Sequence, residues 1–338
     1  MSATRTYLAQ MTFSAILAVS PASARADSFG IPRPDPPGTR TRVEFGAFIL
    51  DVSNINSADQ TFTADVGLVL RWHDPRLVTP GGAVKVVNRT DVWNPDLYVL
   101  NQRNVTLLLP DVVDVNPDGI ILYRQRFSGQ FSNRIHVGDF PFDSHRFHVR
   151  FVSGRYSMDE LEFVNDVFKD RTGVTEKPLV VDWVITSWRA HEEAFTEGML
   201  SFARPSFSVE FTAARRAGFF VMKLLLPLGL VVFMSWVVFW LDPERVDAQV
   251  GMAATAILTL IAYRFTFDSL LPPVSYLTRV DHFISGSTAL VFLSLLQVVI
   301  TGTLVSRNRI PDARRLDRWS RAVFPALFAL LTWWSFFA

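Results

Sequence analysis

The sequence contains no cysteine and almost no net charge, with 33 Lys and Arg against 32 Asp and Glu. The absence of cysteine excludes disulfides, thiolate metal sites and cysteine nucleophiles. The balance of charge argues against a nucleic-acid-binding protein, which usually carries a basic excess. The sequence also lacks a glycine-rich phosphate loop, a metal-ligand spacing and a nucleophile–base arrangement, so we expect no cofactor, no bound metal and no enzymatic activity.

Large apolar side chains, in contrast, are abundant. The chain has 29 Phe and 9 Trp, and 49% of its side chains are hydrophobic, which excludes a disordered protein. The mean hydropathy is positive, +0.22, although 19% of the residues are charged. This combination predicts an uneven chain, in which one part is soluble and another is embedded in lipid.

The N-terminal segment has the features of a secretory signal peptide over residues 1–26. Arg5 supplies an early positive charge, a mostly apolar run extends from Met11 to Val19, and Ala24-Arg25-Ala26 matches an A-x-A cleavage site. A short membrane anchor is the alternative, but the run is too short to span a bilayer. Residues 27–42, rich in Pro, Gly and Arg, are expected to form an extended leader.

Residues 43–217 are predicted to form a β domain. Apolar side chains alternate with other residues along 62–72, 147–151 and 207–211, with the period of two that is typical of half-buried strands. Turn signals such as Pro80-Gly81-Gly82 separate many short strands, as in a β-sandwich or barrel. A domain of this size can fold without disulfides because its core is large enough.

Four apolar segments follow the β domain. They are predicted to be transmembrane helices at about 219–241, 247–270, 282–306 and 319–338, within a membrane domain of residues 218–338. Each is long enough, or nearly so, for the roughly 20 residues that cross a bilayer. The second segment is the least apolar of the four and contains Gly, Thr and Gln.

The orientation follows from the ends of these helices. Cleavage of a signal peptide places the β domain outside, so the connector between the third and fourth helices is cytoplasmic. An arginine cluster lies there, made of Arg307, Arg309, Arg314, Arg315, Arg318 and, just beyond, Arg321. The cluster fits the positive-inside rule. Both observations predict a multi-pass protein of the bacterial inner membrane, with its N-terminal domain on the periplasmic or extracellular side.

The second helix carries a stripe of residues at steps of three or four, the spacing of one helical face. The stripe consists of Asp247, Gly251, Thr255, Leu258, Ala262, Phe265 and Ser269. Repeated around the axis of a homo-oligomer, it would line a pore, and Asp247 would form a carboxylate ring that attracts cations. Asp268 adds an acid near the outer mouth. Leu258 and Phe265 would form apolar constrictions that gate by dewetting.

The alternative is a helix that packs a face of small residues against a neighbour. Gly251, Ala253, Ala254 and Ala256 would suit that arrangement. Only the pore interpretation requires several copies of the chain around one axis.

Four motifs, in order along the chain, resemble those of a known family. They are Trp72-His73-Asp74-Pro75-Arg76-Leu77, Trp93-Asn94-Pro95-Asp96, Phe140-Pro141-Phe142-Asp143, and Pro227 followed by Ser235-Trp236-Val237-Val238-Phe239-Trp240-Leu241. With four helices after them, they resemble the prokaryotic branch of the pentameric ligand-gated ion channels, the Cys-loop receptor superfamily. The resemblance extends from about Val43 to the C-terminus.

The resemblance implies an extracellular immunoglobulin-like β-sandwich, a four-helix transmembrane bundle and a homopentamer in a lipid bilayer. An agonist would bind between adjacent outer domains and open a pore lined by the second helix. Cation-passing members place an acid at the inner end of this helix, where the chain has Asp247, and residues 242–250 lack the Pro-Ala insertion usual in anion channels. Monovalent cations are therefore the expected permeant ions, and nucleic acid is not an expected partner.

The resemblance also places the Phe-Pro-Phe-Asp loop at the base of the sandwich, beside the loop between the second and third helices. The candidate coupling residues are Asp139, Phe140, Pro141, Phe142, Asp143, Arg215, Arg216, Pro272 and Pro273. A buried carboxylate–guanidinium pair at this junction would hold the two domains in register. The two prolines would stiffen the connecting loop. Solvated surface charges are the alternative.

The ligand site is the least complete part of the resemblance, because the aromatic box that the family builds for amine ligands is not evident. The candidate ligand-binding residues are Leu100, Tyr123, Arg124, Arg155, Tyr156, Phe195, Phe202 and Phe207. Arg124 and Arg155 could instead favour an anionic or zwitterionic small molecule.

Two further interpretations stay open. Protons are a rival agonist, since some prokaryotic members open at low pH, and the candidate sensors are His136, His145, His148 and His191. Ordinary surface histidines are the alternative explanation for these residues. A membrane-anchored binding or sensory protein that does not conduct is the hypothesis from a different class, and the polar second helix argues against it.

The missing cysteines also bear on the Phe-Pro-Phe-Asp loop. In eukaryotic relatives a disulfide closes this loop, and its two positions hold Asn133 and Phe147 here. We therefore expect packing to close the loop, with Phe147 on the same alternating strand face as Val149 and Phe151.

Overall fold

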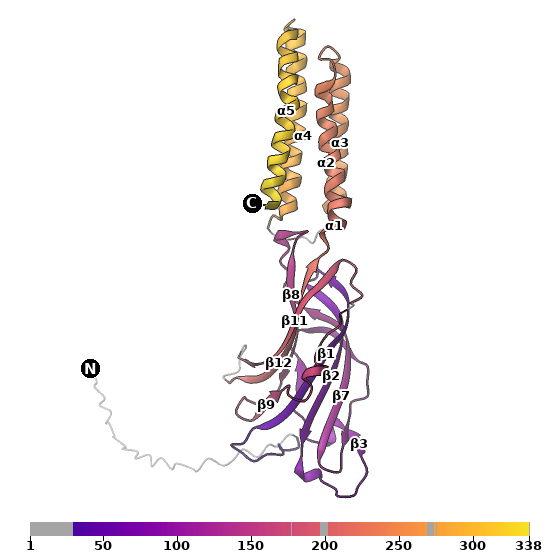
Figure 1. Ribbon diagram of the computed structural model, residues 1–338, viewed down its shortest axis with the longest axis vertical. Helices are drawn as coiled ribbons and strands as arrows, with labels where there is room; N and C mark the ends of the chain where they lie inside the picture. The colour runs from indigo at the N-terminus through magenta and orange to yellow at the C-terminus, as the bar shows by residue number, and fades with distance from the viewer. Residues whose placement is uncertain (1–29, 177, 197–201, 269–273, 275, 338) are drawn as a thin grey trace, which may run out of the picture.

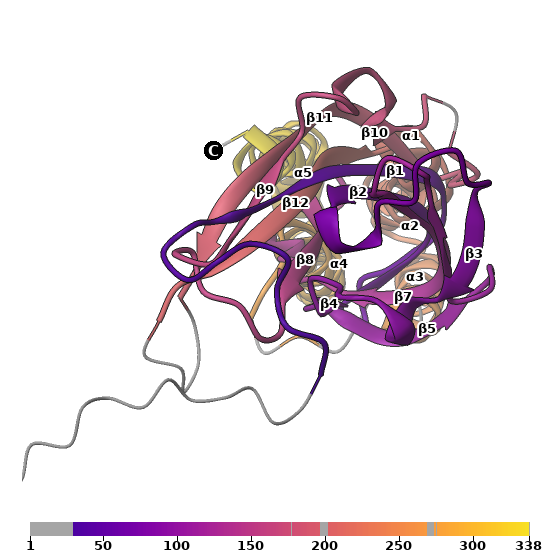
Figure 2. The same ribbon diagram turned by 90° about the horizontal axis from the view of Figure 1, so that it is seen from below.

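The computed structural model describes residues 30–176, 178–196, 202–268, 274 and 276–337. The predicted signal peptide lies outside them. The described chain is elongated, with a β-sandwich at one end and four long helices at the other (Figure 1). Viewed from the sandwich end, the helices lie behind the strands (Figure 2).

The strands of the described residues form two sheets. The larger sheet has the order β10-β1-β2-β7-β6-β3, with β5 paired to β7 and β9 paired to β1, and the smaller has the order β11-β12-β8-β4. The strands are β1 (Thr41–Asn56), β2 (Thr61–His73), β3 (Lys85–Asn88), β4 (Leu97–Val99), β5 (Gln102–Leu107), β6 (Val112–Val115), β7 (Ile120–Ser132), β8 (Ser144–Ser153), β9 (Leu161–Val164), β10 (Gly173–Val174), β11 (Trp183–Phe195) and β12 (Arg204–Arg215).

The core of the sandwich lies between the two sheets and is largely aromatic. The period-two alternation predicted for β2 is confirmed, since the inward set from Phe62 to Trp72 is buried. Across the core, Phe45 of β1 stacks on Phe207 of β12 with ring centroids 4.3 Å apart. A buried side chain of this size contributes about 1.5–3 kcal/mol, so the aromatic layer explains how the domain is stable without disulfides.

The loop that a disulfide closes in eukaryotic relatives is held here by packing and by a hydrogen bond. Phe147, Val149 and Phe151 are all buried in the core, as the alternation predicted. Asn133 is buried as well, and its Nδ2 donates to the backbone carbonyl of Arg146 at 3.1 Å. The amide thus joins the two segments at the place where a disulfide would lie.

Among the described residues, four helical spans are long and apolar enough to cross a membrane. The first runs over Ala217–Trp240 and comprises α1 (Ala217–Phe220), a π-helical turn (Val221–Leu225), α2 (Leu226–Val237) and a 3-10 turn (Val238–Trp240). The others are α3 (Val246–Asp268), α4 (Arg279–Ser306) and α5 (Ile310–Phe337). A capping box of Thr278 and Asp281 fixes the start of α4.

One helix boundary differs from the prediction. The fourth helix was expected from residue 319, but α5 begins at Ile310, so most of the arginine cluster is helical. Asn308, with φ of 59°, ends the preceding helix in the left-handed conformation that favours asparagine and glycine. The chain therefore reverses direction within a short turn between α4 and α5. The arginine cluster that was expected to form the connecting loop lies mostly in α5.

Candidate pore, coupling interface and ligand pocket

The predicted pore stripe lies along the outer face of α3. Asp247, Gly251, Thr255 and Ala262 are exposed in the subunit, and Leu258 and Phe265 are 68% and 73% exposed. The opposite face packs against the other helices through Gln249, Ala253, Ala256 and Leu260, all of them buried. Asp268 is the last residue of α3, and its side chain and the whole of Ser269 lie outside the described residues.

The alternative packing by small residues applies to one face of this helix only. Ala253 and Ala256 are buried inside the bundle. A side chain at Gly251, however, would meet nothing within 4 Å, and Ala254 is exposed. The subunit thus uses two of the four small residues for internal packing and leaves the stripe uncovered.

A buried ion pair lies at the base of the sandwich, where β12 leads into the first span. Arg215 donates from Nε to Oδ1 of Asp143 at 2.8 Å and from Nη2 to Oδ2 at 3.0 Å. The side chains are 8% and 1% exposed. The guanidinium lies 4.2 Å from the ring centroid of Trp183 and 5.0 Å from that of Phe140. This is the carboxylate–guanidinium pair that the sequence predicted.

A histidine completes this cluster. His145 lies on β8, and its Nε2 is 2.8 Å from Oδ2 of Asp143. Burial would raise the pKa of Asp143, but hydrogen bonds from His145 and Arg215 outweigh burial and hold the pKa at about 2. Asp143 is therefore an ionised carboxylate that accepts from two basic side chains.

Further contacts connect the sandwich to the helices. Asp139 pairs with Arg279 at the start of α4, with Nε and Oδ1 2.8 Å apart. The hydroxyl of Tyr276 accepts from the backbone N–H of Val137 at 3.0 Å, and its ring stacks on His136 at 4.4 Å. The base of the sandwich thus contacts both the segment before α4 and the start of α4.

The first and last spans also reach the sandwich base. Phe140 packs edge-on against Phe220 of α1 at 4.9 Å, and Phe142 packs against Phe336 of α5 at 5.8 Å. Pro141 between them is buried. Every residue of the Phe-Pro-Phe-Asp loop therefore lies at the junction.

One predicted coupling residue falls outside this network, and two are not among the described residues. Arg216 is exposed, and its backbone N–H donates to the carbonyl of Asp182, so the buried pair uses Arg215 instead. Pro272 and Pro273 lie outside the described residues. Tyr276 and Arg279 were not among the predicted coupling residues. A charged arginine at the outer end of an apolar helix would have indicated a contact with the sandwich.

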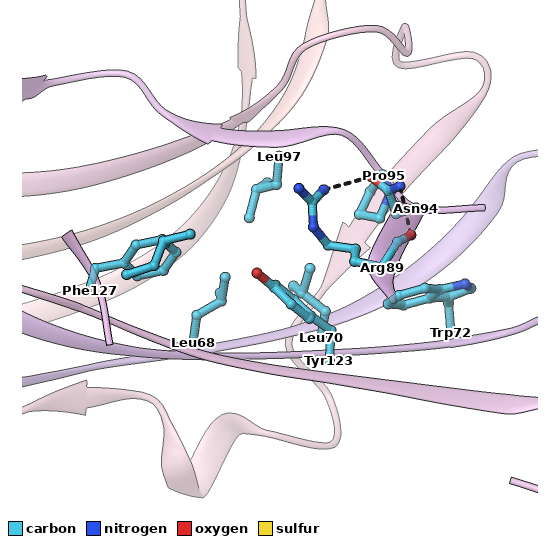
Figure 3. A pocket seen from close by; sticks show the side chains of 10 residues that line it. Leu68, Leu70, Trp72, Arg89, Asn94, Pro95, Leu97, Tyr123 and Phe127 are labelled. Carbon is cyan, nitrogen blue, oxygen red and sulfur yellow. Dashed lines mark hydrogen bonds between the residues drawn. The ribbon is translucent and has the colours of Figure 1, made fainter. Parts of the chain in front are cut away.

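A pocket of about 100 Å³ opens between the sheets of the sandwich (Figure 3). Its lining comes from β2, β4, β5, β7, the Trp-Asn-Pro-Asp turn and Arg89 before that turn, and comprises Leu68, Leu70, Trp72, Arg89, Asn94, Pro95, Leu97, Leu107, Tyr123 and Phe127. Arg89 donates from Nε to Asp111 at 2.8 Å and from Nη1 to Asn94 at 3.0 Å. One cation therefore lies in an otherwise largely apolar pocket.

The same aspartate orders the polar side of the pocket. The Tyr123 hydroxyl donates to Oδ1 of Asp111 at 2.9 Å. Burial raises the pKa of Tyr123 to about 12, and burial of Asp111 is outweighed by hydrogen bonds from Arg89 and Tyr123, which lower the pKa of that carboxyl. Arg89 and Asp111 are thus charged and Tyr123 is neutral at ordinary pH.

The predicted ligand residues do not gather at one place. Tyr123 lines the pocket, while its neighbour Arg124 points to the other face of β7 and pairs with Asp114. Phe207 is 0% exposed and belongs to the core, so assigning it to a ligand site was wrong. Tyr156 is also buried and accepts a hydrogen bond from the Trp93 indole at 2.8 Å.

The remaining candidates lie along the distal part of the sandwich. Leu100 is half-buried beside β8, and its N–H donates to the carbonyl of Arg150. Phe195 is buried at the end of β11, whereas Phe202 is 41% exposed. Arg155 lies close to the leader, near Gly30. Arg89 and Asn94 were not among the predicted ligand residues, although Asn94 belongs to the Trp-Asn-Pro-Asp turn and Arg89 lies just before it.

Comparison with known proteins identifies the family. Residues 31–217 match the neurotransmitter-gated ion-channel ligand binding domain, and residues 224–311 match the neurotransmitter-gated ion-channel transmembrane region. The chain belongs to this family of pentameric ligand-gated ion channels. The predicted family and the predicted fold, a β-sandwich followed by four transmembrane helices, are confirmed, and the protein is a channel subunit rather than an enzyme.

A named relative gives a closer view of this membership. The chain is 25% identical over 294 residues to a proton-gated ion channel of Gloeobacter violaceus. The aligned region covers 85% of this chain and 80% of the relative. A match of this length includes residues of both the sandwich and the membrane helices.

Proposed function

We propose that the protein is a cation-selective homopentameric channel of the bacterial inner membrane, with the sandwich on the outer side. The observation that carries this proposal is the stripe on α3, from Asp247 to Phe265, which the subunit's own helices leave uncovered. Apolar side chains such as Leu258 and Phe265 face an axis shared by five copies, and Asp247 forms a carboxylate ring at the inner mouth.

In this channel the two apolar positions hold the gate. Rings of Leu258 and Phe265 narrow the lumen, and a narrow apolar lumen empties of water and stops ions. Thr255 lies one turn towards the cytoplasm from Leu258, and its hydroxyl bonds the Gly251 carbonyl of its own helix at 2.8 Å. Small and hydroxylated residues therefore follow the acid ring before the apolar constrictions begin.

Signals pass from the sandwich to the pore through two ion pairs. Asp143 and Arg215 fix the end of β12, which leads into the first span, and Asp139 and Arg279 fix the sandwich to α4. A movement of the Phe-Pro-Phe-Asp loop is thereby transmitted to helices on both sides of α3. The buried pair acts as the fixed point, and the half-exposed pair of Arg279 is able to exchange partners.

The proposed stimulus is a small molecule bound between adjacent outer domains or, as the second candidate, protons. Protons are favoured by the position of His145 in the Asp143–Arg215 cluster and of His136 on Tyr276, both at the junction. Imidazole gains charge near pH 6.5. The similarity to a proton-gated channel points the same way.

The experiment is reconstitution of the purified protein in lipid bilayers, followed by current recording in asymmetric salt during a screen of ligands and outer pH. We expect single-channel steps with a reversal potential near that of the cation. Asp247→Arg should move the reversal potential towards the anion value, and Asp242→Arg, an exposed residue before α3, is the matched control. Failure of Asp247→Arg to alter selectivity rejects the assignment of the acid ring, and absence of current under all conditions favours the non-conducting alternative.

A further inference from the structure

A buried polar cluster lies where α3, α4 and α5 meet, at the end of the bundle remote from the sandwich (Figure 1). Its members are Gln249 of α3, Gln297 and Thr301 of α4, and Asp317 of α5. None is more than 7% exposed. Polar groups in lipid-embedded helices are costly unless they bond to one another, so such a cluster requires a specific explanation.

The hydrogen bonds within the cluster converge on one carboxylate oxygen. Gln297 donates from Nε2 to Oδ1 of Asp317 at 2.6 Å and to Oγ1 of Thr301 at 3.0 Å. Thr301 lies 3.2 Å from the same Oδ1. Gln249 also interacts with this carboxyl, and its amide nitrogen lies 3.4 Å from the Val238 carbonyl.

The other oxygens of the cluster have nothing to accept from. Oδ2 of Asp317, Oε1 of Gln297 and Oε1 of Gln249 are buried, and no group in the described part of the chain donates to them. All three are acceptors when the carboxyl is ionised, so they cannot satisfy one another. Three buried oxygens thus lack a donor among the described residues, and a proton on the carboxyl would leave one of them unmatched.

The surrounding helices supply no compensating ion pair. Asp317 forms no salt bridge with any described residue, and the guanidinium whose charge acts on it, Arg321 one turn along α5, donates its hydrogen bond to the Phe239 carbonyl at 2.9 Å. The first span carries no charge near the cluster, and α4 carries none after His282. On α3 the nearest charged group, Asp247, is exposed on the opposite face.

The neighbouring charges outside the cluster are engaged elsewhere or exposed. Arg314, one turn before Asp317, lies 3.8 Å from Asp242 and 3.1 Å from Glu244. Arg318 is exposed, as is Arg245 before α3. An ionised Asp317 would therefore be a buried charge with hydrogen bonds on one oxygen only, which is a costly arrangement.

We propose that this cluster is a proton-binding site, in which Asp317 carries a proton on Oδ2 and donates it to the amide oxygen of Gln249 or Gln297. A single proton converts an unmatched acceptor into a donor and satisfies two oxygens at once. The carboxyl also becomes neutral, which removes the cost of a buried charge.

The site links the pore helix to the outer helix. Gln249 lies on the face of α3 opposite to the stripe, two positions after Asp247. Through the bound proton, the inner end of α3 is joined to α5, and loss of the proton leaves a buried carboxylate whose Oδ2 has no donor among the described residues. This consequence for gating rests on the proposed channel function, whereas the proton site does not.

The direct test is infrared spectroscopy of the full-length protein in lipid vesicles, with ¹³C-labelled aspartate carboxyls. At neutral pH we expect a carboxylic-acid C=O band from Asp317 that shifts with the label. The buried Asp74 and Asp143 should not contribute to this band, because their pKa values are lowered and they are ionised. The band should disappear in Asp317→Asn and remain in Asp312→Asn, a control at an α5 residue that pairs with Arg309. Absence of a labelled acid band in the wild-type protein overturns the proposal without any variant.

Thermal unfolding gives a second test that needs no ion flow. Asn at 317 supplies an amide donor in place of the acid hydroxyl, so Asp317→Asn should unfold within a few degrees of the wild-type protein at neutral pH. It should also lose the fall in unfolding temperature that the wild-type protein and Asp312→Asn show as the pH rises above about 4, the pKa of an aspartate in an unfolded chain. A loss of stability in Asp317→Asn equal to that in Asp317→Ala overturns the proposal, since a carboxylate would then be the required form.

Discussion

The β-sandwich and the helix bundle differ in how completely one subunit buries its apolar side chains. In the sandwich, Phe45, Phe62 and Phe207 are fully buried between sheets of the same chain. In the bundle, Leu258 and Phe265 of α3 are 68% and 73% exposed on a single continuous face. A single subunit therefore completes the sandwich and leaves α3 uncovered, which is the reason to place other copies of the chain against it.

Two phenylalanine substitutions should separate the regions most strongly. Phe207→Ala removes a core ring and is expected to cost about 3–5 kcal/mol of unfolding free energy. Phe265→Ala removes a ring that is 73% exposed in its own subunit, so a clearly smaller loss is expected. The measurement is unfolding of the detergent-solubilised protein by circular dichroism. Equal losses would contradict the difference between the two regions.

The junction between the regions should depend on one arginine of an adjacent pair. Arg215→Ala leaves Asp143 buried without its guanidinium and is expected to cost about 3–5 kcal/mol, together with loss of current. Arg216→Ala, at an exposed neighbour, should change stability by no more than about 0.5 kcal/mol. The same unfolding assay and current recordings measure both. A similar effect of the two substitutions would place the junction elsewhere.

The same pair should make the stability of the sandwich depend on acid. The pKa of Asp143 is about 2 in the folded protein and about 3.9 in an unfolded chain. Because the folded value is the lower one, the stabilisation, about 2.5 kcal/mol, is present above pH 4 and is lost as the pH falls towards 2. Unfolding midpoints measured over this range should fall less steeply in Asp143→Asn than in the wild-type protein. Parallel curves would exclude this carboxyl as the cause.

The second ion pair should matter for signalling more than for stability. Arg279 and Asp139 are 37% and 64% exposed, so Arg279→Gln should cost no more than about 1 kcal/mol. We nevertheless expect a shift in the stimulus needed for half-maximal current, because the pair joins the sandwich to α4. Arg307→Gln, at the opposite end of the same helix, is the control. An unchanged response in Arg279→Gln would remove this pair from the coupling route.

Local patterns in the sequence predicted the architecture well. Period-two alternation marked the buried faces of the strands, and apolar runs marked four spans. The same alternation predicts that Phe207 shares the core face with Val209 and Phe211, which is at odds with its place among the ligand candidates. In the structure, Tyr123 and its neighbour Arg124 lie on opposite faces of β7.

The junction and the polar cluster were harder to predict because they join residues far apart in the chain. Asp139 meets Arg279, and Gln297 meets Asp317, only after the helices have packed. No local period of the sequence links such pairs. The start of α5 was also missed, since arginines favour helices as well as loops and only the left-handed Asn308 ends α4.

The central claim, that the exposed face of α3 lines a pore, is tested most directly by single cysteine substitutions. The chain has no cysteine of its own, so each introduced thiol is the only target for a charged, membrane-impermeant thiol reagent. Reagent applied during channel opening should block current irreversibly with cysteine at Thr255, Leu258 or Ala262, and should leave current unchanged with cysteine at Ala253, Ala256 or Leu260. Block at the second set with no block at the first would contradict the account.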